Sequence, residues 1–215
     1  NLRDYLYANP QSITDPNFEG IVATGEETGA AEVIHDEVLW SCNTCRACEE
    51  ACPVNIEYVD KIVDMRRHLV QEAARFPGEL TRVFQGMERQ SNPWGIGGDK
   101  RADWAEGMDI PTLAENPEAE YLFYVGCAGS FDDRAKKITK AVAKLLKAAD
   151  VSFAILGRDE PCNGDTARRL GNEYLYQSMA QMAVETFEGF HVKKVITNCP
   201  HCFNPIKNEF PQFGG

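Results

Sequence analysis

The pattern of apolar and polar residues divides the chain into two regions with different periodicities. After Pro53, apolar residues recur at close to helical spacing until Pro77-Gly78 provides a stop signal. Further along, short apolar runs alternate with helical patterns, in the order 119–126, 131–150, 151–157, 165–187 and 192–198. The order strand, helix, strand, helix, strand predicts an open α/β domain with a parallel sheet, preceded by a mainly α-helical domain.

Between these two regions lies a stretch that is rich in Gly, Pro and Asn. It contains "SNPWGIGG" and "ENPEAE", which are typical of a linker or a draped loop. We therefore predict a helical domain over residues 1–85, a linker or loop over 86–117, and an α/β domain over 118–215.

The helical patterns also predict which faces are buried. In the helix expected at 131–150, one apolar face is formed by Ile138, Ala141, Val142, Leu145, Leu146 and Ala149. A stripe of lysines on the same helix could dock an acidic partner, but it is more typical of a solvated face: Lys136, Lys140, Lys144 and Lys147. In the helix after Pro53, Arg66, Arg67 and His68 are likewise expected to form a solvated face.

Composition and charge narrow the possible functions. The 215 residues are 43% hydrophobic and 26% charged, as in folded globular proteins. The formal net charge of −11 argues against nucleic acid as a partner, because phosphate-backbone binders need clustered Lys and Arg. No apolar run approaches the length of a membrane helix. The chain begins at Asn1 without an initiator Met, so we expect that it could be a fragment of a longer protein.

Four of the eight cysteines fall in one short stretch. They are Cys42, Cys45, Cys48 and Cys52, in the sequence "SCNTCRACEEACPV". The spacing C-x2-C-x2-C-x3-C-P is the run by which bacterial-type ferredoxins hold iron–sulfur clusters. A zinc site usually draws on two separated C-x2-C pairs, so the run favours a [4Fe-4S] cluster over zinc. Because the fourth cysteine of such a run can ligate a second cluster, Cys52 either closes the local cluster or serves a motif upstream of Asn1.

The other four cysteines follow the three predicted strands. Cys127 follows the first strand, Cys162 in "EPCNGD" follows the second, and Cys199 and Cys202 in "CPHC" follow the third. Open α/β sheets place their sites at the carboxyl ends of the strands, so these thiols can converge on a second cluster. Two alternatives stay open, namely buried core thiols and a zinc ion on the same four sulfurs. We expect His201 to be a hydrogen-bonding neighbour rather than a ligand.

The combination of these motifs carries a resemblance. The ferredoxin-type run followed by Cys127, then Cys162-Asn163-Gly164, then Cys199-x2-Cys202 resembles the iron–sulfur oxidoreductases of the heterodisulfide reductase type. The second module is similar to their Rossmann-like, cysteine-rich CCG domain. Within that group, "YVGCAGSFDDRAKK" and "TNCPHCFNPIKNEFPQFGG" look closest to the membrane-associated proteins that pass electrons from electron-transferring flavoprotein to menaquinone.

The resemblance implies an electron-transfer part of an oxidoreductase complex. The donor would be a protein like electron-transferring flavoprotein, and the acceptor a membrane quinone-reducing or haem subunit at the cytoplasmic face of the membrane. One or two [4Fe-4S] clusters would relay single electrons. Asn163 stands where the usual CCG pattern has a second adjacent cysteine, which leaves four ligands rather than five and disfavours direct disulfide chemistry.

Two other functions remain alternatives at this point. The first is a reductase of heterodisulfides, thiol-disulfides or small organic acids, which would need an open iron that a weak or absent ligand at Asn163 could create. The second is a zinc-bound structural module.

Overall fold

The computed structural model describes residues 36–213, which fall into two compact units. The first unit comprises the chain up to Pro77 together with Arg168–Glu173, and the second comprises Gly78–Ala167 and the chain from Tyr174 onward. The predicted domain limits at residues 85 and 117 stay a prediction. Residues 86–117 all lie within the second unit, so their contribution to its core can be described directly.

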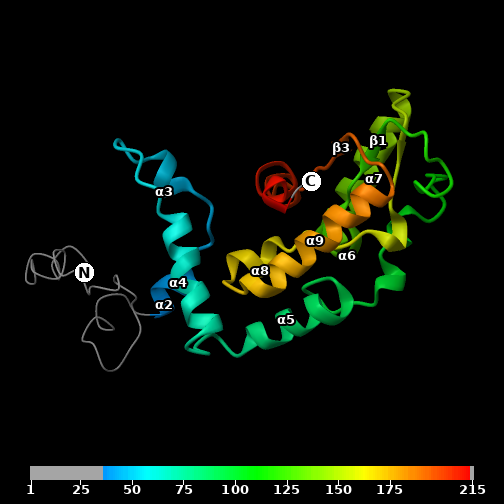
Figure 1. Cartoon of the computed structure of the whole chain (residues 1–215). Helices are drawn as coiled ribbons and strands as arrows, with labels where there is room; N and C mark the ends of the chain where they lie inside the picture. The colour runs from blue at the N-terminus through cyan, green and yellow to red at the C-terminus, as the bar shows by residue number, and fades with distance from the viewer. Residues whose placement is uncertain (1–35, 214–215) are drawn as a thin grey trace, which may run out of the picture. The chain divides into compact units, whose positions relative to one another are not determined.

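The described part of the first unit is helical (Figure 1). Its helices are α2 (Asp36–Ser41), α3 (Ala47–Glu50) and α4 (Val59–Gln71). Leu39 of α2 and Leu69 of α4 are both buried, and these two helices contact each other. Apolar residues at i and i+4 along α4 share one face, which explains why Val59 and Val63 are buried as well. The mainly α-helical character predicted for residues 1–85 is confirmed from residue 36 onward, and residues 1–35 lie outside the described residues.

The second unit contains the predicted open parallel sheet. Its three strands are β1 (Tyr121–Phe123), β2 (Phe153–Ala154) and β3 (Val195–Ile196), in the order β2-β1-β3. Both neighbours of β1 run parallel to it, with Leu122 opposite Ala154 on one side and Val195 on the other. The strands are much shorter than the apolar runs that predicted them, but the α/β class is confirmed.

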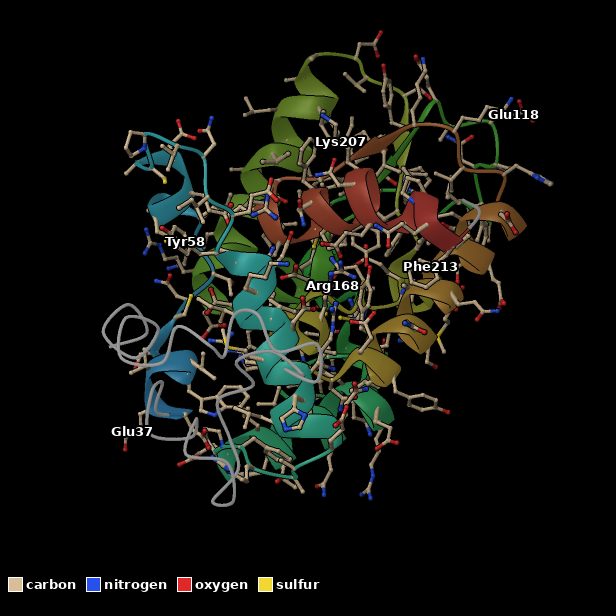
Figure 2. The ribbon with its side chains drawn as sticks, turned by 60° about the vertical axis from the view of Figure 1, so that its left-hand side comes forward. Glu37, Tyr58, Glu118, Arg168, Lys207 and Phe213 are labelled. Carbon is tan, nitrogen blue, oxygen red and sulfur yellow. The ribbon has the colours of Figure 1, made fainter. Side chains whose placement is uncertain are left out.

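One further helix precedes the sheet and several lie between and after its strands; all belong to the second unit except where two of them enter the segment Arg168–Glu173 of the first. They are α5 (Glu79–Gln90), α6 (Gly126–Phe131), α7 (Asp133–Ala148), α8 (Asp165–Arg169), α9 (Glu173–Gly189) and α10 (Pro200–Asn204). Short turns of 3₁₀-helix lie at η3 (Gly98–Lys100), η4 (Asp103–Ala105), η5 (Gly157–Asp159) and η7 (Phe210–Phe213), and a π-helix at η6 (Pro205–Glu209). Phe213, labelled in Figure 2, ends the described chain.

Part of the stretch expected as a linker is built into the core of the second unit. Trp104 is 2% exposed, and its ring packs edge-on against Phe123 of β1, with ring centroids 6.1 Å apart. Thr112 also forms a parallel bridge to Ile155, just beyond β2. Residues 86–117 therefore contribute core side chains rather than only connecting two domains.

The buried face predicted for the helix at 131–150 is correct in part. Val142 and Leu146 are partly buried and pack against the core around Phe123. The fully buried residues of α7 are instead Thr139 and Ala143, whereas Ile138 and Leu145 are 49% and 69% exposed. At Thr139 the helices α6 and α7 approach closely, since a Cβ added at Gly129 would lie 2.6 Å from the Thr139 hydroxyl oxygen.

The helix predicted over 165–187 is interrupted. It forms α8 and α9, separated by a break at Gly171, whose φ of +81° is in the left-handed region that favours glycine. An added Cβ at Gly171 would collide with the backbone of Arg66 and Arg67 in α4. The glycine therefore allows the segment Arg168–Glu173 to pack closely within the first unit.

Candidate metal centres

The first cysteine set occupies a tight loop around α3. Cys42 follows α2, Cys45 lies in the loop, Cys48 lies within α3, and Cys52 follows α3 closely. The loop turns sharply because Thr44 and Arg46 adopt left-handed backbone conformations, with φ of 54° and 63°. Local sequence alone thus brings four thiols into one short segment.

Two thiols of this loop accept hydrogen bonds from the backbone. The Thr44 N–H donates to Cys42 Sγ, and the Ile56 N–H donates to Cys52 Sγ, both at 3.4 Å. The N–H groups of Ile56 and Val54 lower the pKa of Cys52, and the Tyr58 hydroxyl lowers it further. Tyr58, labelled in Figure 2, immediately precedes α4. These donors favour the thiolate form, which is the form that binds metal.

Arg66 supports this loop, contrary to the solvated face predicted for it. Its side chain is only 3% exposed, and its guanidinium donates to the carbonyl oxygens of Leu39, Cys42 and Arg169. Burial lowers the pKa of Arg66, while the adjacent Cys42 opposes that shift. The arginine therefore fixes the backbone on which the first ligand candidate stands.

The second cysteine set is assembled from three loops of the second unit. Cys127 lies in α6 after β1, Cys162 lies between η5 and α8, and Cys199 and Cys202 lie at and within α10 after β3. The thiols of Cys127 and Cys162 are hydrogen-bonded to each other, and so are those of Cys199 and Cys202. The structure thus joins the four thiols in two pairs.

Gly126 and Tyr124 tie the two pairs together. Gly126 has a φ of +75°, and Cys202 Sγ occupies the space that a Cβ at this position would need. The Tyr124 hydroxyl donates to the Pro161 carbonyl at 2.6 Å, beside Cys162. Burial raises the pKa of Tyr124, and the nearby thiols of Cys202, Cys162 and Cys127 raise it further. Segments from all three loops therefore converge, as their positions after the strands predicted.

Two buried charged residues, Arg101 and Glu160, hold the backbone and the thiol around Cys127. Glu160 accepts hydrogen bonds from the N–H groups of Val125 and Gly126, both at 2.8 Å. Arg101 donates to the Ser91 carbonyl at 2.6 Å and lies 3.3 Å from Glu160 and 3.5 Å from Cys127 Sγ. Neither Glu160 nor Arg101 was predicted from the sequence. Arg101 lies in the stretch expected as a linker, and no motif distinguishes it there.

Each pair of thiols contains one group that ionises more readily. The hydrogen bond from Cys162 and the charge of Arg101 lower the pKa of Cys127 against the effect of burial, whereas the same hydrogen bond and burial raise the pKa of Cys162. In the other pair, the Cys202 thiol and backbone N–H groups lower the pKa of Cys199 to about 6. The pKa of Cys202 is raised by its bond to Cys199 and by burial. In each pair, the pKa of one thiol is thus lowered and that of the other is raised.

Asn163 is occupied by a structural hydrogen bond. Its side-chain oxygen accepts from the Asp165 N–H at 2.9 Å, an Asx turn that leads into α8. His201 Nδ1 lies 2.8 Å from Asp165 Oδ2 and so contacts a carboxylate. Both side chains are therefore in contact with Asp165 at the start of α8.

The described donor set of the second site consists of four thiols. Among residues 36–213, no three His, Cys, Asp or Glu side chains are gathered closely enough to hold one metal ion. A cubane takes one thiolate on each of its four irons, so its ligands are spread over a larger volume than those of a single ion. Four free thiols and a glycine cradle at Gly126 are compatible with such a group.

Comparison with known families identifies both parts of the chain. Residues 7–56 match a 4Fe-4S dicluster domain, and residues 121–207 match the CCG cysteine-rich domain. This chain is an iron–sulfur protein with a ferredoxin-type and a CCG domain. Its cofactors are [4Fe-4S] clusters. The dicluster match covers one cysteine run, because the chain has no cysteine before Cys42.

The relatives of this iron–sulfur protein confirm the predicted resemblance. It is 47% identical over 88% of its length to the EtfAB:quinone oxidoreductase of Syntrophomonas wolfei, and 48% identical over 85% to the probable iron-sulfur-binding oxidoreductase FadF of Bacillus subtilis. It covers 27% of each of those proteins. One subunit of the dihydromethanophenazine:CoB--CoM heterodisulfide reductase of Methanosarcina barkeri is 24% identical over 81% of the chain, which covers 42% of that polypeptide. No solved structure matches.

The chain thus spans about a quarter of the length of its more similar relatives and carries oxidoreductase-type iron–sulfur domains. Among its described residues, no helix is both long enough and apolar enough to cross a membrane.

Proposed function

We propose that this chain relays single electrons from a flavoprotein donor to a quinone-reducing membrane partner. The donor would resemble electron-transferring flavoprotein, and the acceptor would be a quinone-reducing or haem subunit or domain. The name of the Syntrophomonas relative, EtfAB:quinone oxidoreductase, supports this direction. A probable membrane-anchored ferredoxin of Chromohalobacter salexigens, 43% identical over 83% of the chain, supports a position at a membrane, which in this proposal is its cytoplasmic face.

In this proposal the eight cysteines hold the clusters in two sets. Cys42, Cys45, Cys48 and Cys52 would form the ferredoxin-type site, and Cys127, Cys162, Cys199 and Cys202 the CCG site. A [4Fe-4S] cluster supplies one-electron transfer, with a potential set by burial, charge and hydrogen bonds to sulfur. The protein then has to supply the ligands, exclude water and fix the surrounding charges. The buried Cys162 and Cys202 suit the exclusion of water at the second site.

The observation that carries the relay proposal is the engagement of Asn163. A reductase acting through an open iron needs a weak or missing ligand beside Cys162, and Asn163 is the residue at that position. Its oxygen instead accepts the Asp165 N–H, and four thiols remain as a complete set for one cubane. This favours an electron carrier over a disulfide or organic acid reductase.

Reduction by a flavoprotein tests the proposal. The chain is purified anaerobically and mixed in a stopped-flow instrument with reduced electron-transferring flavoprotein. We expect bleaching of the iron–sulfur absorbance together with one-electron oxidation of the flavin. The Cys45→Ser and Cys162→Ser variants show which site accepts the electron first.

Three results would contradict the relay proposal. Zinc without iron would indicate the structural module, turnover of a disulfide or small organic acid would indicate a reductase, and an intact cluster that the reduced flavoprotein does not bleach would remove the proposed donor.

A further inference from the structure

Arg101 is the buried cation that lies closest to the second cysteine set among the described residues. Its side chain is 2% exposed, although arginine is almost never fully buried without partners. It follows η3 in the stretch that sequence composition predicted to be a linker. The position of a full charge at this depth calls for a role beyond the packing of a loop.

The guanidinium of Arg101 is held in one orientation. One terminal nitrogen donates to the Ser91 carbonyl at 2.6 Å and lies 3.5 Å from Cys127 Sγ, while the other lies 3.3 Å from Glu160 Oε1. The ring of Phe131 lies against it, with its centroid 5.3 Å from the guanidinium carbon. Because the fork is planar and rigid, these contacts fix the direction of the N–H group that faces the sulfur.

The charge of Arg101 is not fully neutralised by Glu160. Both carboxylate oxygens of Glu160 already accept backbone hydrogen bonds of 2.8 Å from Val125 and Gly126, and the contact with Arg101 is longer, at 3.3 Å. An arginine keeps its charge in proteins, so Arg101 is a cation, and Cys127 Sγ is one of its partners at 3.5 Å.

We propose that Arg101 is a positioning residue that orients Cys127 and raises the reduction potential of the cluster in the CCG domain. The proposal rests on the proposed function, because it concerns the cluster that the four thiols would hold. Each electron that enters adds one negative charge to the site. A cation in contact with a ligand sulfur, in a poorly solvated interior, stabilises the reduced state more than the oxidised state.

The test is a redox titration of the full chain with dithionite, monitored by EPR. Arg101→Gln removes the charge and keeps a hydrogen-bond donor, while Arg101→Lys keeps the charge. Arg134→Gln is the matched control, because it makes the same charge change at an exposed position of α7. We expect Arg101→Gln to lower the reduced-to-oxidised ratio of the second cluster on the order of tenfold at fixed potential, about 59 mV for one electron.

The lysine variant and the control distinguish the effect of the Arg101 charge from a structural effect of replacing its side chain. Arg101→Lys is expected to retain most of the wild-type potential, and Arg134→Gln and the first cluster are expected to stay unchanged. If Arg101→Gln fails to assemble the second cluster while Arg101→Lys assembles it, the role of the charge is supported. An assembled Arg101→Gln cluster with the wild-type potential, or the same loss in both Arg101 variants, would overturn the proposal.

Failure of this inference is distinct from failure of the proposed function. Iron and acid-labile sulfide are measured first in the wild-type chain. Their absence would overturn the proposed function itself, whereas their presence with an unshifted Arg101→Gln potential would overturn only the role of Arg101.

Discussion

The first cysteine set comes from one continuous loop, residues 42–52, whereas the second comes from three loops that follow three different strands. Cys45 and Cys48 of the first set are exposed, whereas Cys162 and Cys202 of the second are 5% and 4% exposed. The loop of the first site is supported from outside mainly by Arg66 of α4. The second site depends on the sheet, on α10 and on the buried pair of Arg101 and Glu160. Its four thiols can therefore come together only when the second unit is folded.

This difference has energetic consequences. Cys45 or Cys48 of the first set can be replaced with little change in packing, because both residues are exposed. Around the second site, a change in a neighbouring side chain leaves a buried polar group without its partner, which costs far more than an exposed contact contributes. We therefore expect substitutions near the second site to destabilise its unit more than substitutions near the first site destabilise the first unit.

The largest effect is expected from the buried ion pair of the second unit. Glu160→Ala leaves Arg101 and the N–H groups of Val125 and Gly126 without their carboxylate, which is expected to destabilise the unit by about 3–5 kcal/mol. In the first unit, Arg46→Gln removes an exposed guanidinium that pairs with Glu49 and Asp60, both at 3.6 Å, and is expected to change the stability little. Urea unfolding of the metal-free chain measures both. Equal losses of unfolding free energy in the two variants would contradict the expected difference between the two units.

The next effect is expected at Gly126, where the second site has no room for a side chain. Gly126→Ala forces a left-handed conformation on alanine and places a methyl group on Cys202 Sγ, with an expected cost of about 1–3 kcal/mol and loss of iron from the second site. Gly189→Ala is the control, because nothing lies within 4 Å of its added Cβ. Iron analysis and thermal unfolding check the pair. Retention of full iron in Gly126→Ala would show that Cys202 is not held there.

A smaller effect is expected from Asn163. Asn163→Ala removes the acceptor for the Asp165 N–H and is expected to destabilise the second unit by about 1 kcal/mol, while Asn163→Asp preserves the acceptor. Both variants are expected to keep the second cluster with the wild-type EPR spectrum, because Asn163 is not among its ligands. Loss of the cluster in Asn163→Ala alone would make Asn163 a ligand and reopen the reductase hypothesis.

The smallest effect concerns thiol reactivity in the metal-free chain. Because the pKa of Cys199 is lowered to about 6, this thiol is mostly ionised at pH 7, and its alkylation by iodoacetamide should slow as the pH falls through 6. Cys162, which is buried and has a raised pKa, should react slowly throughout. Peptide mapping by mass spectrometry follows both residues. Faster alkylation of Cys162 than of Cys199 would contradict the lowered pKa of Cys199.

The local features of the fold were predictable from the sequence. The positions where two helices approach each other closely were not. The ferredoxin-type run, the helix ending before Pro77 and the parallel sheet each follow from spacing or periodicity over a few residues. The buried face of α7 was predicted only in part: Val142 and Leu146 pack against the core, but the buried Thr139, which lies close to Gly129, was not expected. A contact of this kind depends on the distance between two helices, which periodicity does not encode.

The same distinction applies to the sites. The cysteines could be named from spacing and from their positions after strands, because the topology of an open sheet brings strand ends together. Arg66 was expected on a solvated face because it is charged. The three carbonyl groups that accept its hydrogen bonds could not be identified from the sequence. Arg101 was missed for the same reason. A buried cation is recognised by its partners, and those partners come from distant parts of the chain.

Iron and sulfide content, measured together with EPR in the wild-type chain and in two cysteine variants, decides whether there are two separate four-thiolate sites. After anaerobic purification we expect about eight irons and eight sulfides per wild-type chain, and about four of each in Cys45→Ser and in Cys162→Ser, with a different EPR signal lost in each variant. Zinc in place of iron, or a Cys162→Ser chain that keeps its full iron content and both signals, would contradict the assignment of a cluster to the converging thiols of the second unit.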